Sequence, residues 1–296
     1  MDVWSSIEGA IQAATDRPFT LSRREPVGGG CINETFRIEG GGRSYFVKLH
    51  RAGALGMFEA EAAGLAELAA AQAVRVPRPV CTGEAGGRSF LAMEYIAFGG
   101  GRSGALLGQQ LAQLHRRTAD SFGWSRDNTI GSTLQINTPG HDWVAFWREH
   151  RLGFQLRLAA EGGHGGRLQR LGERLLVGLG ALFRDYHPVA SALHGDLWGG
   201  NWGVDARGQP VLFDPAFYYG DREADLAMTE LFGGFDQRFY AAYREAYALD
   251  PGYGVRKTLY NIYHILNHLN LFGGGYGAQA EGMMASVLAE LGIPCG

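Results

Sequence analysis

The sequence predicts an α+β protein built as two lobes, a small β-rich N-lobe over residues 1–97 and a larger, mostly helical C-lobe over residues 98–296. Short alternating runs of apolar and polar residues, separated by glycine turns, fill most of the N-lobe, and this pattern is typical of strands. Helical periodicity dominates the rest of the chain. A glycine run at 99–101 separates the two patterns, and we place the lobe boundary just before it. The same run could serve as a plain linker, and the two interpretations are compatible.

The bulk composition is that of an ordinary globular protein. The 296 residues are 46% hydrophobic and 19% charged, with a formal net charge of −3. Scattered basic residues exclude nucleic acid and anionic membranes as expected partners, and no apolar run reaches the length of a membrane span. The N-terminal residues lack the regions of a secretory signal, and the three cysteines are widely spaced. We therefore expect a cytoplasmic protein without a disulfide framework or a zinc site.

The N-lobe is predicted to begin with an amphipathic helix at 3–14 and a strand–turn–strand unit at 21–38. The turn is a glycine-rich loop formed by Gly28, Gly29, Gly30 and Cys31. Glycines there allow backbone N–H groups to approach phosphates closely. The alternative is a plain hairpin turn, since neither a complete GxGxxG nor a Walker A motif is present.

Lys48 lies near the end of the next predicted strand, at 44–49. A lysine at a strand end is by default a solvated charge. However, only Lys48 and Lys257 are lysine among 27 basic residues, and an ammonium is not interchangeable with a guanidinium. Kinases keep a lysine on the corresponding strand, where it contacts the α- and β-phosphates. This context favours a phosphate-binding Lys48.

A helix at 57–72 offers two carboxylates that could pair with Lys48. Glu61 shares one helical face with Phe58, Leu65 and Leu68, whereas Glu59 lies on the opposite side. Because a carboxylate on an apolar stripe is costly unless it is paired, we predict Glu61 as the partner. After an extended connector at 76–80, the apolar strand at 89–96 is similar to a kinase hinge, which reads an adenine edge with backbone groups.

The C-lobe is predicted to contain a polar loop at 128–137 and a series of helices. The helices are expected at 106–117, 142–158, 168–187 and 258–271. Trp143, Phe146 and Trp147 of the second helix are predicted to be core residues rather than a ligand box.

The motif that organises the chain is HGDLWGGN at 194–201, followed by a predicted hairpin and by FDP at 213–215. In phosphotransferases, an Asp in such a loop receives the proton of the acceptor hydroxyl, and an Asn five residues later binds Mg²⁺. A second Asp beyond the hairpin completes the metal site. The sequence therefore predicts Asp196 as the catalytic base and Asn201 and Asp214 as magnesium ligands.

The alternative for this motif is simple turn chemistry, because an Asp in a loop readily hydrogen-bonds its own backbone. The full spacing with the hairpin and Asp-Pro is much rarer than a lone HxD, and it favours the functional interpretation. Gly195 replaces the Arg with which protein kinases read a phosphorylated activation loop, and Pro215 replaces the Phe of Asp-Phe-Gly. These departures favour a small-molecule kinase.

Four segments together carry a family resemblance: MFEAEAAGL at 57–65, HGDLWGGN, FDPAFYYGDREADLAM at 213–228 and LNHLNLFGGGY at 266–276. The chain resembles the fructosamine-3-kinase (ketosamine-3-kinase) family over nearly its whole length. That family is related to aminoglycoside phosphotransferases and has a two-lobed protein-kinase-like fold. The resemblance implies ATP- and Mg²⁺-dependent phosphorylation of the sugar 3-hydroxyl of ketosamines, which destabilises the adduct and reverses glycation.

The resemblance also implies roles for single residues. Lys48 and Glu61 would form the phosphate-positioning ion pair beneath the glycine-rich loop, and Glu94 and Ile96 would form the hinge. Asp225 would brace the catalytic loop.

Four further residues would face the sugar: Trp198, Asn267, His268 and Asn270. For Trp198, packing beside a buried loop is an equal alternative.

Two other functions stay open from the sequence. One is a kinase for another small hydroxyl compound, such as an aminoglycoside or an amino alcohol, which would need acidic residues around a cationic substrate. The other is a nucleotide-binding pseudokinase, although every group that the chemistry needs is present. Sugar length and the amine carrier stay undetermined, and we expect a monomer or weak dimer.

Overall fold

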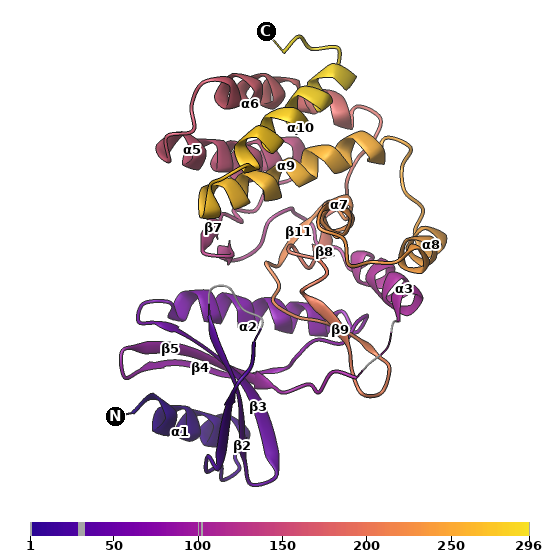
Figure 1. The fold of residues 1–296 in the computed structure, drawn as a ribbon. Coiled ribbons are helices and arrows are strands. Elements are labelled where there is room, and N and C mark those ends of the chain that lie inside the picture. The colour runs from indigo at the N-terminus through magenta and orange to yellow at the C-terminus, as the bar shows by residue number, and fades with distance from the viewer. Residues whose placement is uncertain (1, 29–32, 100, 102, 296) are drawn as a thin grey trace.

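The computed structural model of the chain describes residues 2–28, 33–99, 101 and 103–295. Within its described residues, the N-lobe is built from one sheet and two helices (Figure 1), namely α1 (Val3–Thr15), β1 (Arg23–Pro26), β2 (Glu34–Gly40), β3 (Arg43–Arg51), α2 (Leu55–Ala70), β4 (Pro79–Ala85) and β5 (Arg88–Glu94). The sheet is antiparallel, with strand order β1-β2-β3-β5-β4. Its two faces are covered by different helices, which determines where the side chains of β3 point.

Alternation along β3 explains the position of Lys48. Val47 and Leu49 join Ile7 and Ile11 of α1 in one buried cluster. Successive residues of a strand face opposite sides of its sheet, so Lys48 points toward the other face. There α2 packs, and the buried side chains of Phe58, Leu65 and Leu68 confirm its predicted apolar face.

The C-lobe is mostly helical (Figure 1). Its helices are α3 (Gly104–His115), α4 (Trp143–Phe146), α5 (Gly153–Glu161), α6 (Arg167–Gly178), α7 (Glu223–Leu231), α8 (Gln237–Ala246), α9 (Tyr253–Phe272) and α10 (Tyr276–Glu290). Its short strands are β6 (Asn128–Ile130), β7 (Thr133–Gln135), β8 (Ser191–Leu193), β9 (Trp202–Val204), β10 (Pro210–Leu212) and β11 (Tyr218–Gly220). Trp143, Phe146 and Trp147 are buried, as predicted for core residues. The expected α+β, two-lobed architecture is confirmed.

Several short elements differ from the prediction. The connector at 76–80 leads directly into an unpredicted edge strand, β4, with an irregular register between Pro79 and Cys81. The polar loop at 128–137 is a hairpin, β6–β7, and β8 pairs with β11. These strands escaped prediction because they have three residues each or carry prolines and polar side chains, which weakens the alternation signal.

Two predicted helices are also irregular. The helix at 142–158 begins at Trp143, with Asp142 as its N-cap, and passes through a π-helical segment at Trp147–Leu152 before α5. The helix predicted at 168–187 ends at Gly178 and continues only as a 3₁₀ segment, Leu179–Phe183.

The two lobes make close contact through α2 and through the segment after β5. A Cβ atom added at Gly64 of α2 would lie 2.9 Å from Cβ of Phe217 in the C-lobe, so this helix packs directly against the chain that follows Asp214. The amide of Gly99 donates to the carbonyl of Val204 in β9 (2.8 Å). We propose residue 97 as the lobe boundary, because it lies between the end of β5 and this contact. Among the described residues, no helix is long and apolar enough to cross a membrane.

Candidate active site

The predicted catalytic loop, at 194–201, leaves β8 and is held by Asp225 of α7. Asp225 accepts hydrogen bonds from the backbone amides of His194 (2.7 Å) and Gly195 (2.8 Å). Its carboxylate also contacts His115 Nε2 at 3.2 Å. Burial alone would raise the pKa of Asp225, but these hydrogen bonds and the neighbouring histidines hold it below its usual value. Asp225 therefore braces the loop as an ionised acceptor.

Two further features fix the loop. Gly195 has φ +83°, and an added Cβ would lie 2.0 Å from the carbonyl oxygen of Ala216, so only glycine fits there. His194 accepts the amide of Asp196 at Nδ1 (3.3 Å), which leaves Nε2 to donate to the carbonyl of Phe213 (2.9 Å). Burial lowers the pKa of His194, which agrees with this neutral tautomer.

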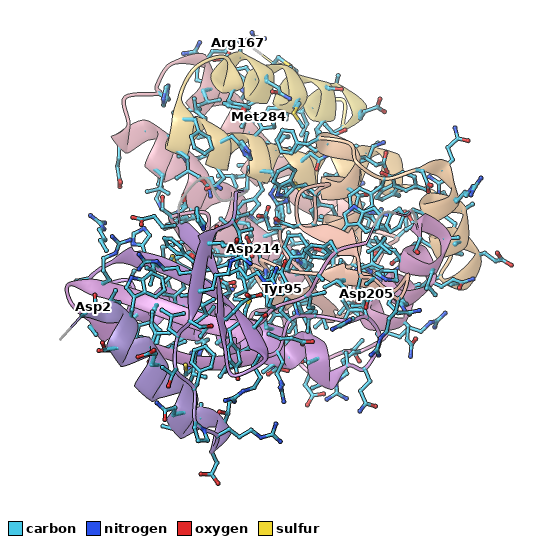
Figure 2. All side chains as sticks on the ribbon, turned by 60° about the horizontal axis from the view of Figure 1, so that its bottom comes forward. Asp2, Tyr95, Arg167, Asp205, Asp214 and Met284 are labelled. Carbon is cyan, nitrogen blue, oxygen red and sulfur yellow. The ribbon has the colours of Figure 1, made fainter. Side chains whose placement is uncertain are left out.

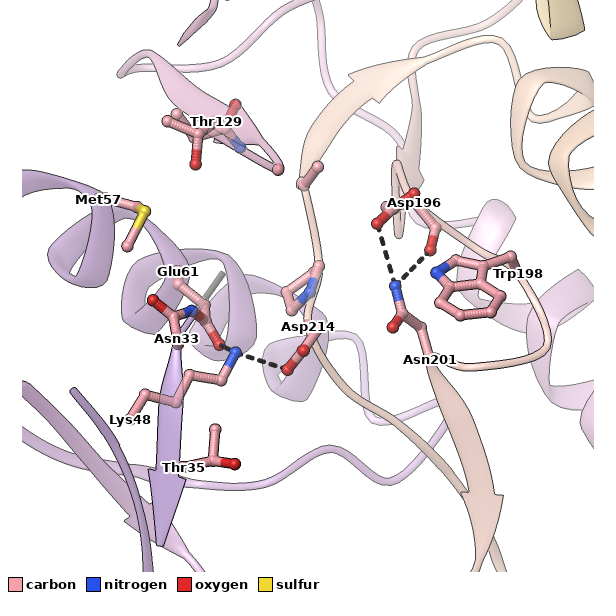
Figure 3. A pocket seen from close by; sticks show the side chains of 14 residues that line it. Asn33, Thr35, Lys48, Met57, Glu61, Thr129, Asp196, Trp198, Asn201 and Asp214 are labelled. Atoms are coloured by element: carbon pink, nitrogen blue, oxygen red, sulfur yellow. Dashed lines mark hydrogen bonds and ion pairs between the residues drawn. The ribbon is translucent and has the colours of Figure 1, made fainter. Parts of the chain in front are cut away.

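Asp196 and Asn201 lie side by side in this loop (Figure 3). Asn201 Nδ2 donates to the backbone carbonyl of Asp196 (2.8 Å) and to its Oδ2 (3.1 Å). Burial, reinforced by the charge of Asp214, raises the pKa of Asp196 to about 7, although the hydrogen bond from Asn201 opposes the shift. A carboxyl poised near neutral pH is suited to accept a proton from a hydroxyl group.

The predicted metal loop returns through the β9–β10 hairpin. The amide of Phe213 donates to the carbonyl of Asn201 (3.0 Å), and this bond brings Asp214 back toward Asn201, as expected from the sequence. Asp214 has φ +57°, a left-handed conformation that is uncommon for a residue other than glycine.

Lys48 joins the two lobes at the site. Its Nζ lies 2.6 Å from Glu61 Oε1 and 2.6 Å from Asp214 Oδ1. Burial alone would lower the pKa of Lys48, but the two carboxylates outweigh it and raise the pKa above its usual value. Glu59 is exposed, so the structure places Glu61, and not Glu59, against Lys48, as the helical-face argument predicted.

These residues line one cavity of about 210 Å³ between the lobes (Figure 3). Its lining includes the predicted Lys48, Glu61, Asp196, Trp198, Asn201 and Asp214. Sequence reasoning did not assign the other members: Asn33, Thr35, Met57, Asn128, Thr129, Gly131, Pro215 and Ala216. Thr35 could have been suggested because it pairs with Lys48 across the strands, and Met57 because it lies one helical turn before Glu61. The residues of the β6–β7 hairpin had no chemical signal in the sequence. In the wider view of Figure 2, Asp214 lies at the junction of the two lobes.

The hinge residues have different surroundings. The Glu94 side chain forms an ion pair with Arg75 (2.7 Å), and its amide donates to the carbonyl of Arg78 (2.8 Å), so neither group is free to read a base. Ile96 is buried. Gly28 is exposed at the end of β1, and Gly29, Gly30 and Cys31 lie outside the described residues.

The predicted sugar-facing residues divide into two groups. Trp198 lies on the cavity wall with 40% of its surface exposed. In contrast, Asn267 bonds to Gln155 (3.2 Å) and to the carbonyl of Ile130 (3.4 Å), and Asn270 donates to Gln155 Oε1 (2.7 Å). These two amides are engaged within the fold, and they and His268 are not part of the cavity lining. In the structure, the side chains of Asn267 and Asn270 therefore form hydrogen bonds within the fold, which the sequence did not predict.

The residues present fit a hard cation. Because Nδ2 of Asn201 is held by Asp196, its amide oxygen is left for a ligand, and Asp214 offers a carboxylate. Among the described residues there is no cluster of three or more His, Cys, Asp or Glu suited to a metal. Mg²⁺ takes one or two carboxylates and completes its shell with water and phosphate oxygens, so the oxygens of Asp214 and Asn201 fit its requirements.

Comparisons with known proteins agree with this geometry. The model of the fructosamine kinase family matches residues 3–290. A probable ketoamine kinase of Synechocystis is 47% identical, over 96% of this chain and 97% of the relative. The chloroplastic protein-ribulosamine 3-kinase of Arabidopsis thaliana is 43% identical, over 90% of this chain and 82% of the relative.

The fold agrees as well. The crystal structure of a candidate fructosamine-3-kinase from Haemophilus somnus superposes with a TM-score of 0.88 at 29% identity, covering 96% of this chain and 97% of that one. The protein-kinase-like fold expected from the resemblance is therefore confirmed. With the family model spanning nearly all of its length, the chain belongs to the fructosamine kinase family.

Proposed function

We propose that this protein transfers the γ-phosphoryl group of ATP to the 3-hydroxyl of a ketosamine, and that it acts in deglycation. The observation that carries the proposal is the convergence of Lys48, Glu61, Asp196, Asn201 and Asp214 on one cavity. These are the side chains that phosphoryl transfer to a hydroxyl needs. Family membership and the names of the relatives support the acceptor class.

The protein's own groups would position the reactants and move one proton. Lys48, held by Glu61, contributes a fixed positive charge for the phosphates. Asp196 accepts the proton of the attacking hydroxyl as its oxygen bonds to the γ-phosphorus. The bond from that phosphorus to the β–γ bridging oxygen breaks, and ADP leaves with this oxygen. Orientation of the acceptor beside Asp196 supplies much of the rate enhancement. Mg²⁺, held by Asn201 and Asp214, would neutralise charge on the phosphate oxygens.

The cavity favours a ketosamine over an aminoglycoside. Three of its lining residues are acidic, Glu61, Asp196 and Asp214, and each has a role in the phosphoryl transfer just described. The other described lining residues are uncharged, apart from Lys48. A polycationic aminoglycoside would need further carboxylates, whereas a ketosamine offers hydroxyls and a single amine.

Within the ketosamines, we propose ribulosamine and erythrulosamine ahead of fructosamine. The acyclic and furanose forms of short sugars would fit a tight acceptor pocket more easily than a pyranose. The Arabidopsis relative is named as a ribulosamine kinase. We further propose a cytoplasmic location and a monomeric or weakly dimeric state.

The test is a coupled assay of ADP release with Mg²⁺–ATP and a panel of acceptors. Erythrulosamine, ribulosamine and fructosamine on one amine are compared with free ribulose and an aminoglycoside. We expect kcat/KM to be highest for a ketosamine, because free ribulose lacks the amine and loses binding. An aminoglycoside that outperformed every ketosamine would overturn the proposed acceptor while leaving the kinase chemistry intact.

A further inference from the structure

The backbone of Asp214 lies in a conformation that its neighbours must enforce. At φ +57°, a non-glycine residue is strained, and such residues persist only where the surrounding structure determines them. On the N-terminal side, His194 Nε2 donates to the carbonyl of Phe213 (2.9 Å). On the C-terminal side, the amide of Ala216 donates to the carbonyl of His194 (2.9 Å). Two further backbone acceptors on that side are the carbonyls of Ala216 and Phe217.

Both carbonyls are bound by side-chain amides of the β6–β7 hairpin. Gln135 Nε2 donates to the carbonyl of Ala216 (3.0 Å), and Asn128 Nδ2 donates to the carbonyl of Phe217 (2.8 Å). Gln135 also donates to Asn128 Oδ1 (2.9 Å), which links the two donors. With exposed fractions of 1% for Gln135 and 7% for Asn128, water competes little for these bonds. We call this pair the amide clamp.

The clamp is itself oriented from two sides. The hydroxyl of Tyr263 in α9 donates to Gln135 Oε1 (2.9 Å), which fixes which end of the Gln135 amide faces Ala216. Asn137 donates to Asn128 Oδ1 (2.9 Å) and accepts from Arg151 (2.7 Å). Arg151 belongs to the π-helical segment and is fully buried.

The same network continues onto the chain beyond the clamp. The Arg151 guanidinium lies 4.2 Å from the ring centre of Tyr218, the first residue of β11, which pairs with β8. Helix α7 then begins at Glu223. The chain from Asp214 to α7 is therefore short and makes contacts along its length.

We propose that Gln135 and Asn128 are positioning residues that hold Asp214 in its ligand conformation. The inference rests on the proposed function, in which Asp214 binds Mg²⁺ with the nucleotide. Neither clamp residue needs to touch the metal, because both act through the backbone carbonyls of Ala216 and Phe217. Partners of this indirect kind commonly change metal affinity by roughly 10- to 100-fold when they are removed.

The chain offers a matched control for a test. Gln155 is also a fully buried glutamine of the C-lobe. Its amide bonds to Asn267 and Asn270 and lies beside the hydroxyl of Tyr263, but its bonds do not go to the carbonyls that follow Asp214. Gln135→Leu and Gln155→Leu therefore remove the same chemistry at two buried positions. Titration calorimetry of the full chain, without acceptor, measures the affinity for ADP with and without Mg²⁺.

We expect Gln135→Leu to weaken Mg²⁺–ADP binding by roughly 10- to 100-fold while leaving metal-free ADP binding unchanged. Excess Mg²⁺ should restore kcat in this variant. Gln155→Leu should show a comparable loss of thermal stability with no change in either affinity. Tyr263→Phe, which removes only the hydroxyl that orients Gln135, should shift Mg²⁺–ADP affinity in the same direction and decides the question if Gln135→Leu does not fold.

Two results would overturn the clamp. The first is that Gln135→Leu binds Mg²⁺–ADP as tightly as Gln155→Leu does. If Gln135→Leu does not fold, the same comparison is made between Tyr263→Phe and Gln155→Leu. The other is an equal loss of metal-free and metal-bound ADP affinity in the clamp variant. The wild-type protein separates this inference from the proposed function: if Mg²⁺ did not strengthen its binding of ADP, the metal assignment of Asp214 itself would fail.

Discussion

The ammonium of Lys48 lies 2.6 Å from Oδ1 of Asp214, although 166 residues separate them in the chain. This contact ties β3 of the N-lobe to the metal loop of the C-lobe across the cavity. In the proposed reaction, Lys48 would contact the nucleotide phosphates, and the carboxylate of Asp214 would bind Mg²⁺. The ion pair thus holds both groups close to the positions that they need.

We expect Asp214→Asn to weaken the binding of Mg²⁺–nucleotide, because a neutral amide is a poorer ligand for a hard cation than a carboxylate. Binding of the metal-free nucleotide should be at least as tight as in the wild type, since a negative charge near the phosphates is lost. Calorimetric titrations with and without Mg²⁺ measure both. Superimposable Mg²⁺–nucleotide curves for the two proteins would refute the metal assignment.

Lys48 and Glu61 should act as a unit. Lys48→Ala and Glu61→Ala are each expected to lower kcat/KM strongly, and the double variant should be little worse than either one, because residues that work as one unit are not additive. Glu59→Ala is the matched control on the same helix, where the side chain is exposed. Steady-state kinetics on the four variants measures the coupling. A larger effect at Glu59 than at Glu61 would contradict the assignment.

Asp196→Asn is expected to lower kcat by roughly 10²- to 10⁴-fold, the usual loss on removing a general base. Nucleotide affinity should change little, because the hydroxyl acceptor, and not the nucleotide, meets this side chain in the proposed mechanism. The measurements are kcat with a ketosamine and the dissociation constant for Mg²⁺–ADP. A decrease in kcat of less than about tenfold would show that another group takes the proton.

Much of this site could be predicted because its residues are related by local spacing. Asp196 and Asn201 share one loop, and the hairpin that returns Asp214 to them has a recognisable turn. Glu61 could be chosen over Glu59 from helix periodicity alone. In each case, the helical period or the length of a short loop shows which residues lie close together in space.

The amide network could not be predicted in this way. Asn128 and Gln135 looked like a polar loop, because hydrophobic periodicity does not distinguish an exposed amide from one buried in hydrogen bonds. The same limit applies to Asn267 and Asn270. Their side chains were expected at the sugar, but their internal partner, Gln155, lies more than 100 residues away and has no local signal.

Acid stability should depend on His264. Burial lowers the pKa of His264 from 6.5 to about 3, so the unfolded chain binds a proton there that the folded chain does not. The neutral ring of His264 therefore makes its full contribution to the free energy of unfolding above about pH 6.5, and this contribution is lost as the pH falls toward 3. The loss is at most about 1.4 kcal/mol per pH unit. His264→Leu should flatten this dependence.

Denaturant unfolding at pH 7 and pH 4.5 provides the measurement for His264. The control is His187→Leu, the same substitution at an exposed histidine, which should leave the pH dependence of the wild type intact. Parallel stability losses between the two pH values in the wild type and in His264→Leu would rule out this histidine as a source of acid sensitivity.

The wall formed by Trp198 should determine acceptor affinity. A Cβ atom added at Gly200 would lie 2.2 Å from the Trp198 ring, so the ring lies directly over this glycine. Its exposed face, on the cavity wall beside Asp196, is suited to pack against the apolar side of a sugar or a nearby ammonium. Trp198→Ala removes the ring, and Gly200→Ala displaces it without removing it.

We expect both substitutions to raise the KM for the ketosamine by more than tenfold while changing the KM for ATP little. Trp198→Phe should recover part of the lost affinity, since an aromatic face remains. Trp202→Ala serves as the control, because Trp202 stacks on Phe235 and is absent from the cavity lining. If Trp198→Ala altered thermal stability and both KM values to the same degree as Trp202→Ala, the ring would be a packing residue. The alternative left open by the sequence would then be correct.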